Sequence, residues 1–394
     1  MKRKICIITD SRAEYGILKP LVKEIACDNE LQLQLVVTGA HLSPEFGLTY
    51  KAIEEDGFKI DEKIESTLSS DTPVGITKSM ALTLMGCGEV FFRLAPDVIV
   101  ILGDRYEMVT AAMAAQVLRI PIAHLYGGET TVGAVDEAFR HAITKMSCLH
   151  FVSTDQYRKR VIQLGEDPAR VYNVGAMGID NIKTLKLLSR EELQNDLGVR
   201  FLKKNIIVTF HPVTLENNTT QQQFYNLVSV LEKLDDTAIV FTKTNTDTHG
   251  RVINTMIDEF VSRHKDRAWS FLSLGQLRYL SMLKHVDAVV GNSSSGIVEA
   301  PSFKIGTINI GDRQKGRLRA DSIIDCEPTV CSIQASVERL YTDDFKKKLG
   351  MTVNLHGDGN AAKAICRILK EAKLDGIIKK HFFDVEFKCS GDAK

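Results

Sequence analysis

Short apolar runs alternate with amphipathic segments along the first half of the chain. Runs typical of buried strands occupy residues 4–9, 31–38, 98–102, 121–125, 149–152 and 171–174. Between them, apolar residues recur with a helical period, most clearly in residues 76–94 and 136–147. Steady alternation of strand and helix predicts a parallel sheet covered by helices.

The same pattern begins again after a connector. Residues 177–204 are mostly helical and polar, and contain no run typical of a buried strand. Further strands are predicted at residues 205–210, 238–242, 269–272, 288–290 and 306–310, and an amphipathic helix at residues 360–373. We therefore expect two α/β domains, residues 1–178 and 179–375, and a tail, residues 376–394, that can pack back on the first domain.

Unusual polar residues follow the predicted strands, and ligands of open parallel sheets bind beyond the carboxyl ends of the strands. In the first half these residues are Arg12, Asp104, Arg105, Glu129 and Asp136. In the second half they are His211, Asn245, Ser293, Ser294 and Arg313. Two sheets whose ligand edges face each other across a cleft would gather all of them.

Each of these residues also has an ordinary structural interpretation. Asp104 and Asp136 can be helix N-caps, and Glu129 follows the flexible pair Gly127-Gly128, as a solvated turn carboxylate would. His211 precedes a proline, which keeps it out of helical geometry. Their shared location at strand ends, rather than any single residue, favours a functional site.

The stretch that begins at Gly291 predicts an anion site. A strand leads into Gly291-Asn292-Ser293-Ser294, and a helix beginning at the serines would present unpaired N–H groups and a partial positive charge. Small residues let an anion approach such a tip. Glu299 lies about one and a half helical turns further on, within reach of a sugar attached to that anion. An ordinary serine N-cap explains the stretch equally well.

Composition excludes several function classes. Lys plus Arg and Asp plus Glu both number 50, so no basic excess points to nucleic acid. Eight scattered cysteines are typical of reduced thiols in a cytosolic protein, and their spacing does not favour a zinc site. No signal peptide and no run near the roughly 20 apolar residues of a membrane span is present, so we expect a cytoplasmic protein without a membrane partner.

Known nucleotide and hydrolase signatures are absent. The chain has no Gly-x-Gly-x-x-Gly after the first strand and no Walker A sequence, which disfavours dinucleotide binding and ATP hydrolysis. It also lacks His-Glu-x-x-His and a Gly-x-Ser-x-Gly nucleophile elbow.

Seven short motifs, taken together, resemble those of one enzyme family in the same order. They are residues 10–16 (DSRAEYG), 103–105 (GDR), 127–129 (GGE), 136–141 (DEAFRH), 211–212 (HP), 291–294 (GNSS) and 311–314 (GDRQ). The chain resembles the hydrolysing UDP-N-acetylglucosamine 2-epimerases of sialic acid biosynthesis, the bacterial NeuC type, over about residues 1–370. Asp10 replaces the glycine usual in the first motif, and Tyr126 stands where relatives carry Glu or His.

The resemblance implies a fold and a set of substrate contacts. The fold would be α/β in the GT-B arrangement, with two Rossmann-like parallel-sheet domains facing a central cleft, and no metal or other cofactor is required. Arg12, Arg313, Ser293 and Ser294 would meet the diphosphate. The other substrate-binding positions would be Arg105 for the nucleotide sugar, Glu299 for the ribose, Asn245 for the nucleotide, and Gly16 within the first motif.

The resemblance also implies a reaction. UDP-N-acetylglucosamine and water would give N-acetylmannosamine and UDP, by elimination of UDP to a 2-acetamidoglucal and rehydration, on a route to capsule or surface polysaccharide. Asp104, Glu129 and Asp136 would be the acid and base groups, unassigned among themselves, and His211 would lie by the sugar or the glycosidic oxygen. A homodimer or homotetramer is expected.

Other activities stay open. The first alternative is a hydrolysing 2-epimerase of UDP-2,4-diacetamido-2,4,6-trideoxyglucose (UDP-N,N′-diacetylbacillosamine), on the legionaminic acid route. It would present the same UDP and C2 acetamide, and would differ around C4 and C6. A glycosyltransferase of the same fold, a non-hydrolysing epimerase that keeps UDP on its product, and a non-catalytic sensor of UDP sugars are less well supported.

Overall fold

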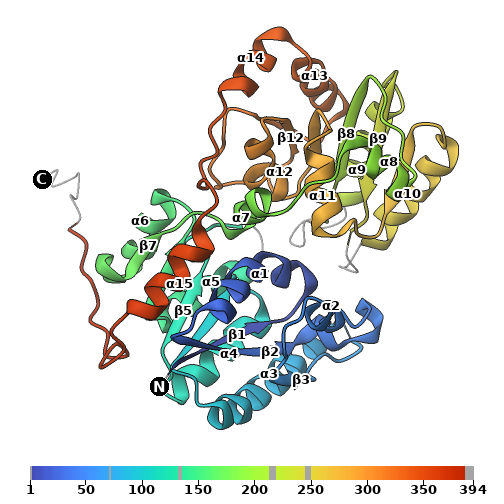
Figure 1. The fold of residues 1–394 in the computed structure, drawn as a ribbon. Coiled ribbons are helices and arrows are strands. Elements are labelled where there is room, and N and C mark those ends of the chain that lie inside the picture. Colours follow the sequence, from blue (N-terminus) through green and yellow to red (C-terminus); the bar gives the residue numbers. More distant parts are fainter. Residues whose placement is uncertain (1, 71, 132–134, 213–218, 245–249, 387–394) are drawn as a thin grey trace, which may run out of the picture. The chain divides into compact units, whose positions relative to one another are not determined.

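A computed structural model describes residues 2–70, 72–131, 135–212, 219–244 and 250–386 (Figure 1). The chain forms two compact units. Unit 1 comprises Met1–Glu129, Val135–Asp180 and Gly359–Lys394, and unit 2 comprises Thr130–Ala134 and Asn181–Asp358. In the described part of the chain, every helix is too short or too polar to cross a bilayer.

Unit 1 contains a seven-stranded sheet in the order β3-β2-β1-β4-β5-β6-β7, and every strand pair is parallel. The strands are β1 (Arg3–Thr9), β2 (Leu31–Thr38), β3 (Glu62–Ile64), β4 (Val98–Leu102), β5 (Ile122–Leu125), β6 (Leu149–Val152) and β7 (Val171–Asn173). All five residues of β4 are buried, because helices cover both faces of a parallel sheet.

Side chains of β1 alternate between two cores, as the pleat requires. Ile5 and Ile7 pack with α1 (Arg12–Cys27) and α15 (Ala361–Glu371). Cys6 and Ile8 pack with α3 (Pro73–Leu94), α4 (Tyr106–Val117) and α5 (Asp136–Met146). The remaining helices of this unit are α2 (Tyr50–Glu55) and α6 (Asp155–Gln163), with short 3₁₀ turns at Gly39–Leu42, Pro44–Phe46 and Pro168–Arg170.

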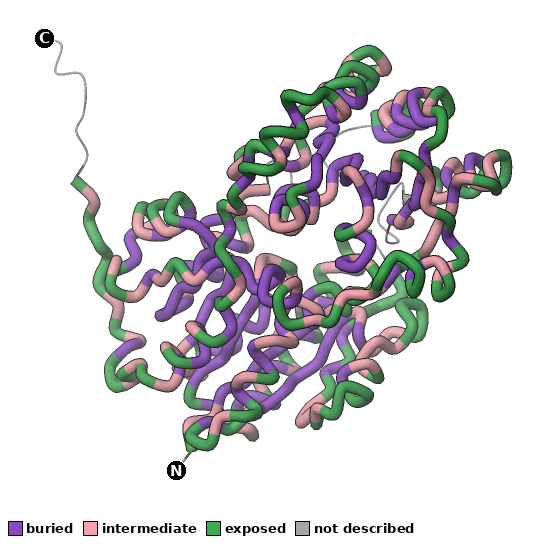
Figure 2. The backbone as a smooth tube through the Cα atoms, turned by 45° about the horizontal axis from the view of Figure 1, so that its top comes forward, coloured by how far each residue is buried: buried purple, intermediate pink, exposed green. Residues whose placement is uncertain are grey.

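Unit 2 repeats this plan with a six-stranded parallel sheet in the order β10-β9-β8-β11-β12-β13. Its strands are β8 (Lys204–Thr209), β9 (Thr237–Thr242), β10 (Ala268–Phe271), β11 (Ala288–Gly291), β12 (Gly306–Ile310) and β13 (Ile323–Cys326). The strands of both units are largely buried, and exposed residues gather on the helices and turns (Figure 2).

Two cores again flank the sheet of unit 2. One contains α9 (Thr220–Leu231), α10 (Gly250–Arg263), α13 (Val330–Leu340) and Phe345 of α14 (Asp343–Met351). The other contains α11 (Gly275–Leu283), with parts of α7 (Met177–Thr184) and α8 (Arg190–Leu197). The helix α12 (Ser295–Val298) and the 3₁₀ turn Ala300–Phe303 follow β11.

The predicted α/β fold class is therefore confirmed, with two parallel-sheet domains. Two short strands, β3 and β13, were not predicted. The predicted amphipathic helix at residues 360–373 exists as α15 but belongs to unit 1 rather than to the second domain. There it packs on α1, and the carboxylate of Asp180 caps it by accepting from the backbone N–H groups of Ala361 and Ala362 at 3.0 and 2.7 Å.

Candidate active site

The order of the strands places a topological switch point at the carboxyl ends of β1 and β4 in unit 1. The connections leave these neighbouring strands in opposite directions along the sheet, and such a switch point is where open α/β sheets bind ligands. Asp10 follows β1, and Gly103-Asp104-Arg105 follow β4. Gly103 has φ +75°, a left-handed conformation that favours glycine, so the chain can turn sharply there.

A guanidinium joins the two strand ends. Arg105 Nε donates to Asp10 Oδ2 at 2.5 Å, and Arg105 Nη2 donates to Glu107 Oε1 at 3.1 Å. The backbone N–H of Asp10 donates to Glu14 Oε2 at 2.7 Å. Asp10, Glu14 and Glu107 are buried, whereas the Arg105 side chain is 48% exposed. The cluster therefore holds a cation in one position and leaves about half of its side chain exposed for an anion.

The charges of this cluster follow from burial and from Arg105. Burial alone would raise the pKa of Asp10, but the charge of Arg105 and the surrounding hydrogen bonds lower it. Burial and the negative charge of Asp10 raise the pKa of Glu14 well above its usual range, and raise that of Glu107 to about 7. Asp10 is thus the anionic partner of Arg105, and burial beside Asp10 favours the protonated form of Glu14.

A second guanidinium, which is buried, contacts two of the predicted catalytic residues, Asp104 and Glu129. Arg140 of α5 forms an ion pair with Asp104, donates to Glu137 Oε2 at 2.5 Å, and donates to the backbone carbonyl of Glu129 at 2.7 Å. The Glu129 carboxylate accepts from Ser153 Oγ at 3.1 Å. The Arg140 side chain is 3% exposed, so its guanidinium is buried among these acceptors.

Asp136 begins α5 close to this group. Burial raises the pKa of Asp136, and the charge of Asp104 raises it further. Asp104, Glu129 and Asp136 therefore lie in one region of unit 1, and their surroundings differ. Carboxyl groups whose environments separate their pKa values can act as an acid and a base in one site.

A buried histidine connects helix α5 to the turn that precedes Asp104. His124 of β5 shares hydrogen bonds with the Gly103 carbonyl through Nε2, at 2.8 Å, and with Thr144 Oγ1 of α5 through Nδ1, at 3.1 Å. Burial lowers the pKa of His124 to about 3, so the ring is neutral. His124 was not predicted as a site residue, because its only signal in the sequence is one polar residue inside an apolar strand.

Other predicted residues of unit 1 lie on α1 and after β5. Arg12 is the first residue of α1 and is exposed, and Gly16 lies one helical turn further along. Tyr126 has φ +67°, and its hydroxyl accepts from the Gly178 N–H at 3.4 Å. A Cβ atom on Gly128 would lie 2.4 Å from the Tyr157 carbonyl oxygen, so this motif position needs glycine.

Unit 2 has its own switch point between β8 and β11. His211 follows β8, and Asn292 follows β11. Their contact is reciprocal: the His211 N–H donates to Asn292 Oδ1 at 2.7 Å, and Asn292 Nδ2 donates to the His211 carbonyl at 2.8 Å. A Cβ atom on Gly291 would lie 1.9 Å from the Thr209 carbonyl oxygen, so the close approach of these strand ends requires glycine.

The backbone carbonyl of Asn292 accepts hydrogen bonds from two further side chains. Arg313 Nη1 donates to it at 3.0 Å and Gln314 Nε2 at 2.9 Å. Burial, followed by the positive charge of Arg313, lowers the pKa of His211 to about 4. Unit 2 therefore presents a neutral histidine near an arginine. Asn292 and Gln314 lie within two of the predicted motifs, but no role was predicted for either residue.

The helix predicted at the serines is much shorter than expected. Helix α12 has four residues and gives way to a 3₁₀ turn that contains Pro301, which lacks the N–H needed to continue it. Ser293 Oγ accepts from the Ser295 N–H at 3.3 Å, and Ser294 is the exposed N-cap. Glu299 is the C-cap of α12.

Glu299 lies next to a hydroxyl pair. Tyr279 donates to Ser295 Oγ at 2.7 Å. Burial raises the pKa of Glu299, while a hydrogen bond with Ser295 opposes the shift. Asn245 lies outside the described residues. Among those that are described, no three His, Cys, Asp or Glu side chains are grouped so as to hold a metal ion.

Comparisons with known proteins agree with these motifs. Residues 23–370 match the family described as UDP-N-acetylglucosamine 2-epimerase. A Campylobacter jejuni protein named GDP/UDP-N,N′-diacetylbacillosamine 2-epimerase (hydrolyzing) is 44% identical over 98% of this chain and 100% of its own length. The Escherichia coli polysialic acid biosynthesis protein P7 is 37% identical over 97% of this chain and 98% of its own.

A further relative and a solved structure extend the comparison. A Legionella pneumophila UDP-N,N′-diacetylbacillosamine 2-epimerase (hydrolyzing) is 34% identical over 95% of this chain and 97% of its own. The crystal structure of Neisseria meningitidis UDP-GlcNAc 2-epimerase bound to UDP-GlcNAc shares the fold, with a TM-score of 0.82 and 16% identity over 94% of this chain and 100% of that one. With these matches, the chain belongs to the UDP-N-acetylglucosamine 2-epimerase family, as an enzyme of the hydrolysing UDP-sugar 2-epimerase class.

Proposed function

We propose that this enzyme converts UDP-N,N′-diacetylbacillosamine and water to UDP and the free 2-epimer of the sugar. The observation that carries the choice of substrate is the 44% identity with the Campylobacter jejuni protein of that name over its full length, and the Legionella pneumophila relative supports it. The expectation from sequence was different, because it placed UDP-N-acetylglucosamine first and UDP-N,N′-diacetylbacillosamine second.

UDP-N-acetylglucosamine is the second candidate substrate. The polysialic acid biosynthesis protein P7, at 37% identity, favours it, because polysialic acid biosynthesis fits the sialic acid route expected from sequence. Both substrates carry UDP on C1 and an acetamide on C2, so the same chemistry serves either. Only contacts to C4 and C6 distinguish them.

The C2 hydrogen of these sugars is poorly acidic, because no carbonyl carbon is attached to C2. In the proposed reaction the C1–O bond breaks first, and its electron pair leaves with UDP. The positive charge that develops at C1 then acidifies the C2 hydrogen, which a carboxylate removes to leave a glycal. A proton is next added to C2 from the opposite face, and water adds at C1. One water is consumed, and UDP and the epimerised sugar are released.

The proposed roles follow the charges of the described residues. We assign Arg12, Arg105 and Arg313 to the diphosphate, with Ser293 and Ser294, because stabilising the departing phosphate is the main electrostatic demand. Arg105 is well suited, since Asp10 and Glu107 fix its guanidinium while half of the side chain stays exposed.

Asp104, Glu129 and Asp136 are assigned to proton transfer. The raised pKa of Asp136 favours its protonated form, and therefore a role as the acid at C2. Asp104 forms an ion pair with Arg140, which favours its ionised form and a role as the base. Neutral His211 is assigned to the sugar or the glycosidic oxygen, and Glu299 to the ribose.

Incubation with single sugar nucleotides tests the proposal. UDP-N,N′-diacetylbacillosamine, its GDP counterpart and UDP-N-acetylglucosamine are supplied separately, and products are identified by NMR. We expect free nucleoside diphosphate and a free 2-epimer, formed fastest from UDP-N,N′-diacetylbacillosamine, and we expect Asp104→Asn to abolish both. An epimer that still carries UDP, or release of UDP only when an acceptor sugar is added, would contradict the proposal.

A further inference from the structure

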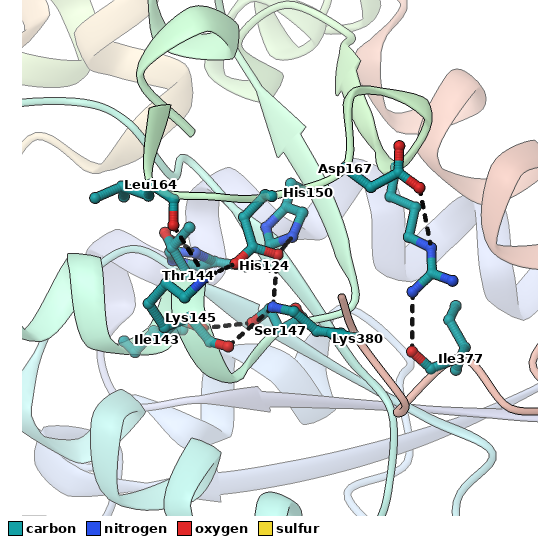
Figure 3. Close-up of polar contacts among 12 residues, drawn as sticks. His124, Ile143, Thr144, Lys145, Ser147, His150, Leu164, Asp167, Ile377 and Lys380 are labelled. Atoms are coloured by element: carbon teal, nitrogen blue, oxygen red, sulfur yellow. Dashed lines mark hydrogen bonds and ion pairs between the residues drawn. The ribbon is translucent and has the colours of Figure 1, made fainter. Parts of the chain in front are cut away.

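Residues 376–386, here called the C-terminal strap, lie against unit 1 near the end of α5 (Figure 3). Arg170 Nη1 donates to the Ile377 carbonyl at 2.9 Å, and the Phe383 N–H donates to the Gly165 carbonyl at 2.9 Å. The Phe382 ring covers Gly165 so closely that a Cβ atom there would lie 2.3 Å from it. The strap therefore makes specific contacts with the rest of unit 1.

Lys380 of the strap caps α5. Its Nζ donates to the carbonyl oxygens of Lys145 and Ser147 at 2.9 and 2.6 Å. Ser147 is the C-cap of α5, and carbonyl groups at the end of a helix have no partner within it. A cation at this end also interacts favourably with the helix dipole. A residue more than 230 positions later in sequence thus supplies hydrogen bonds to the carboxyl end of α5.

A buried carboxylate fixes Lys380 in this position. Glu166 Oε2 pairs with Lys380 Nζ at 2.5 Å and contacts His150 Nε2 at 3.0 Å, while Oε1 pairs with Lys145 Nζ at 2.6 Å. Burial alone would raise the pKa of Glu166, but the hydrogen bond with His150 and the two lysines lower it to about 2. Glu166 is therefore an anion at neutral pH, and its charge-assisted hydrogen bonds are strong ones.

The strap does not pack tightly over its whole length. A cavity of about 230 Å³ remains at the strap, lined by Glu166, Asp167, Arg170 and residues 379–383. Apolar packing is incomplete at this point. Near α5, polar contacts help to hold the strap, and Lys380 makes three of them.

Helix α5 links this capped end to the predicted catalytic residues. Its first residue is Asp136, and Arg140 one turn later holds Asp104. Further along, Thr144 shares a hydrogen bond with His124 (Figure 3). His124 in turn contacts the Gly103 carbonyl. The helix has eleven residues, a length of about 16 Å, so a displacement of one end is transmitted to the other.

We propose that Lys380 is a positioning residue for the epimerase reaction, which sets the place of Asp136 and Arg140 by holding the carboxyl end of α5. The proposal rests on the proposed function for the role of Asp136. Misplacement of a catalytic group by about 1 Å can cost a factor of about 100 in rate. In this proposal Lys380 acts on the predicted catalytic carboxylates through α5.

Three variants test this role. Lys380→Met removes the cation, and Lys380→Arg restores a donor that can reach both the carboxylate and the carbonyls. Lys379→Met is the matched control, because Lys379 is the exposed neighbour on the same strap and loses the same charge. For each variant, kcat and KM for UDP release, the Kd for UDP, and amide hydrogen exchange of residues 136–147 are measured.

We expect Lys380→Met to lower kcat about tenfold while KM and the Kd for UDP change less than about twofold. Exchange should become faster at both ends of α5. Lys380→Arg should recover most of the rate, and Lys379→Met should behave as the wild type. Unchanged kcat in Lys380→Met, an equal loss in Lys379→Met, or no recovery with arginine would overturn the proposal.

Hydrogen exchange separates failure of this inference from failure of the proposed function. If the wild type releases UDP from none of the sugar nucleotides, the proposed function fails, and exchange in α5 decides whether Lys380 holds the helix. Faster exchange of residues 136–141 in Lys380→Met than in Lys379→Met supports the hold on α5. Equal exchange in the two variants contradicts it.

Discussion

Replacing Arg140 by methionine tests whether one buried guanidinium holds the carboxylates of unit 1 in place. The Arg140 side chain is 3% exposed, and its acceptors are the carboxylates of Asp104 and Glu137 and the carbonyl of Glu129. Methionine retains an apolar stem but has no guanidinium and no donor. The variant therefore keeps part of the packing and leaves these acceptors without this partner.

The expected cost follows from the burial of each partner. Removing one member of a buried ion pair costs about 3–5 kcal/mol, because the remaining charge stays unpaired. The side chains of Asp104 and Glu137 are 23% and 27% exposed, so water can reach them in part. We therefore expect a loss near the lower end of that range, about 3 kcal/mol in the free energy of unfolding.

Activity should fall further than stability alone explains. Without Arg140, the Asp104 carboxylate loses this ion pair and can shift from its position, and a misplaced catalytic group costs about 100-fold or more in kcat. Unfolding by guanidinium chloride, followed by near-ultraviolet circular dichroism, gives the free energy, and UDP release gives kcat.

Arg93→Met is the control. Arg93 of α3 is 57% exposed and pairs with Glu62, and exposed pairs are worth about 0–1 kcal/mol. If Arg140→Met unfolds at the same denaturant concentration as Arg93→Met and retains normal kcat, Arg140 does not hold the carboxylates of unit 1 in place.

Three further predictions concern single positions. Gly291→Ala should destabilise unit 2 strongly, since its Cβ would lie 1.9 Å from the Thr209 carbonyl oxygen, whereas Gly88→Ala, with no atom within 4 Å, should be neutral or stabilising; thermal unfolding of both variants checks this. Burial lowers the pKa of His124 to about 3 in the folded protein, whereas an unfolded histidine has a pKa of about 6.5. Between these values the unfolded state binds a proton that the folded state does not. The contribution of neutral His124 to the free energy of unfolding is therefore complete above about pH 6.5 and is lost as the pH falls below it. The difference in unfolding free energy between the wild type and His124→Gln should therefore shrink between pH 6.5 and 4, and a constant difference would contradict it. Asp136→Asn should lower kcat by orders of magnitude and leave the Kd for UDP nearly unchanged, as checked by single-turnover kinetics and calorimetry; normal turnover would remove Asp136 from proton transfer.

Elements with a strong local pattern could be predicted from sequence. Continuous apolar runs such as residues 98–102 gave strands with the same bounds, because burial on both faces requires apolar side chains throughout. Strand β3 has only three residues and an exposed Lys63, and β13 contains an exposed Asp325, so neither shows such a run. Both are edge strands, where burial constrains the sequence least.

Partners across the fold could not be predicted in the same way. Periodicity showed that the helix at residues 360–373 has an apolar face, but not that this face packs on α1 of the first unit. The burial of Arg140 could not be predicted, because its acceptors come from other elements, Asp104 after β4 and Glu129 after β5. The homo-oligomer and the cytoplasmic location stay predictions, as do the roles of the individual site residues.

In the proposed reaction one carboxylate removes the C2 hydrogen after UDP departs, and another group adds a proton to the opposite face, so solvent hydrogen enters the product. The reaction is run in D₂O with UDP-N,N′-diacetylbacillosamine, and the free sugar is analysed by NMR. We expect one deuterium at C2 of the epimerised product for each UDP released. Product that keeps the substrate hydrogen at C2 would contradict it.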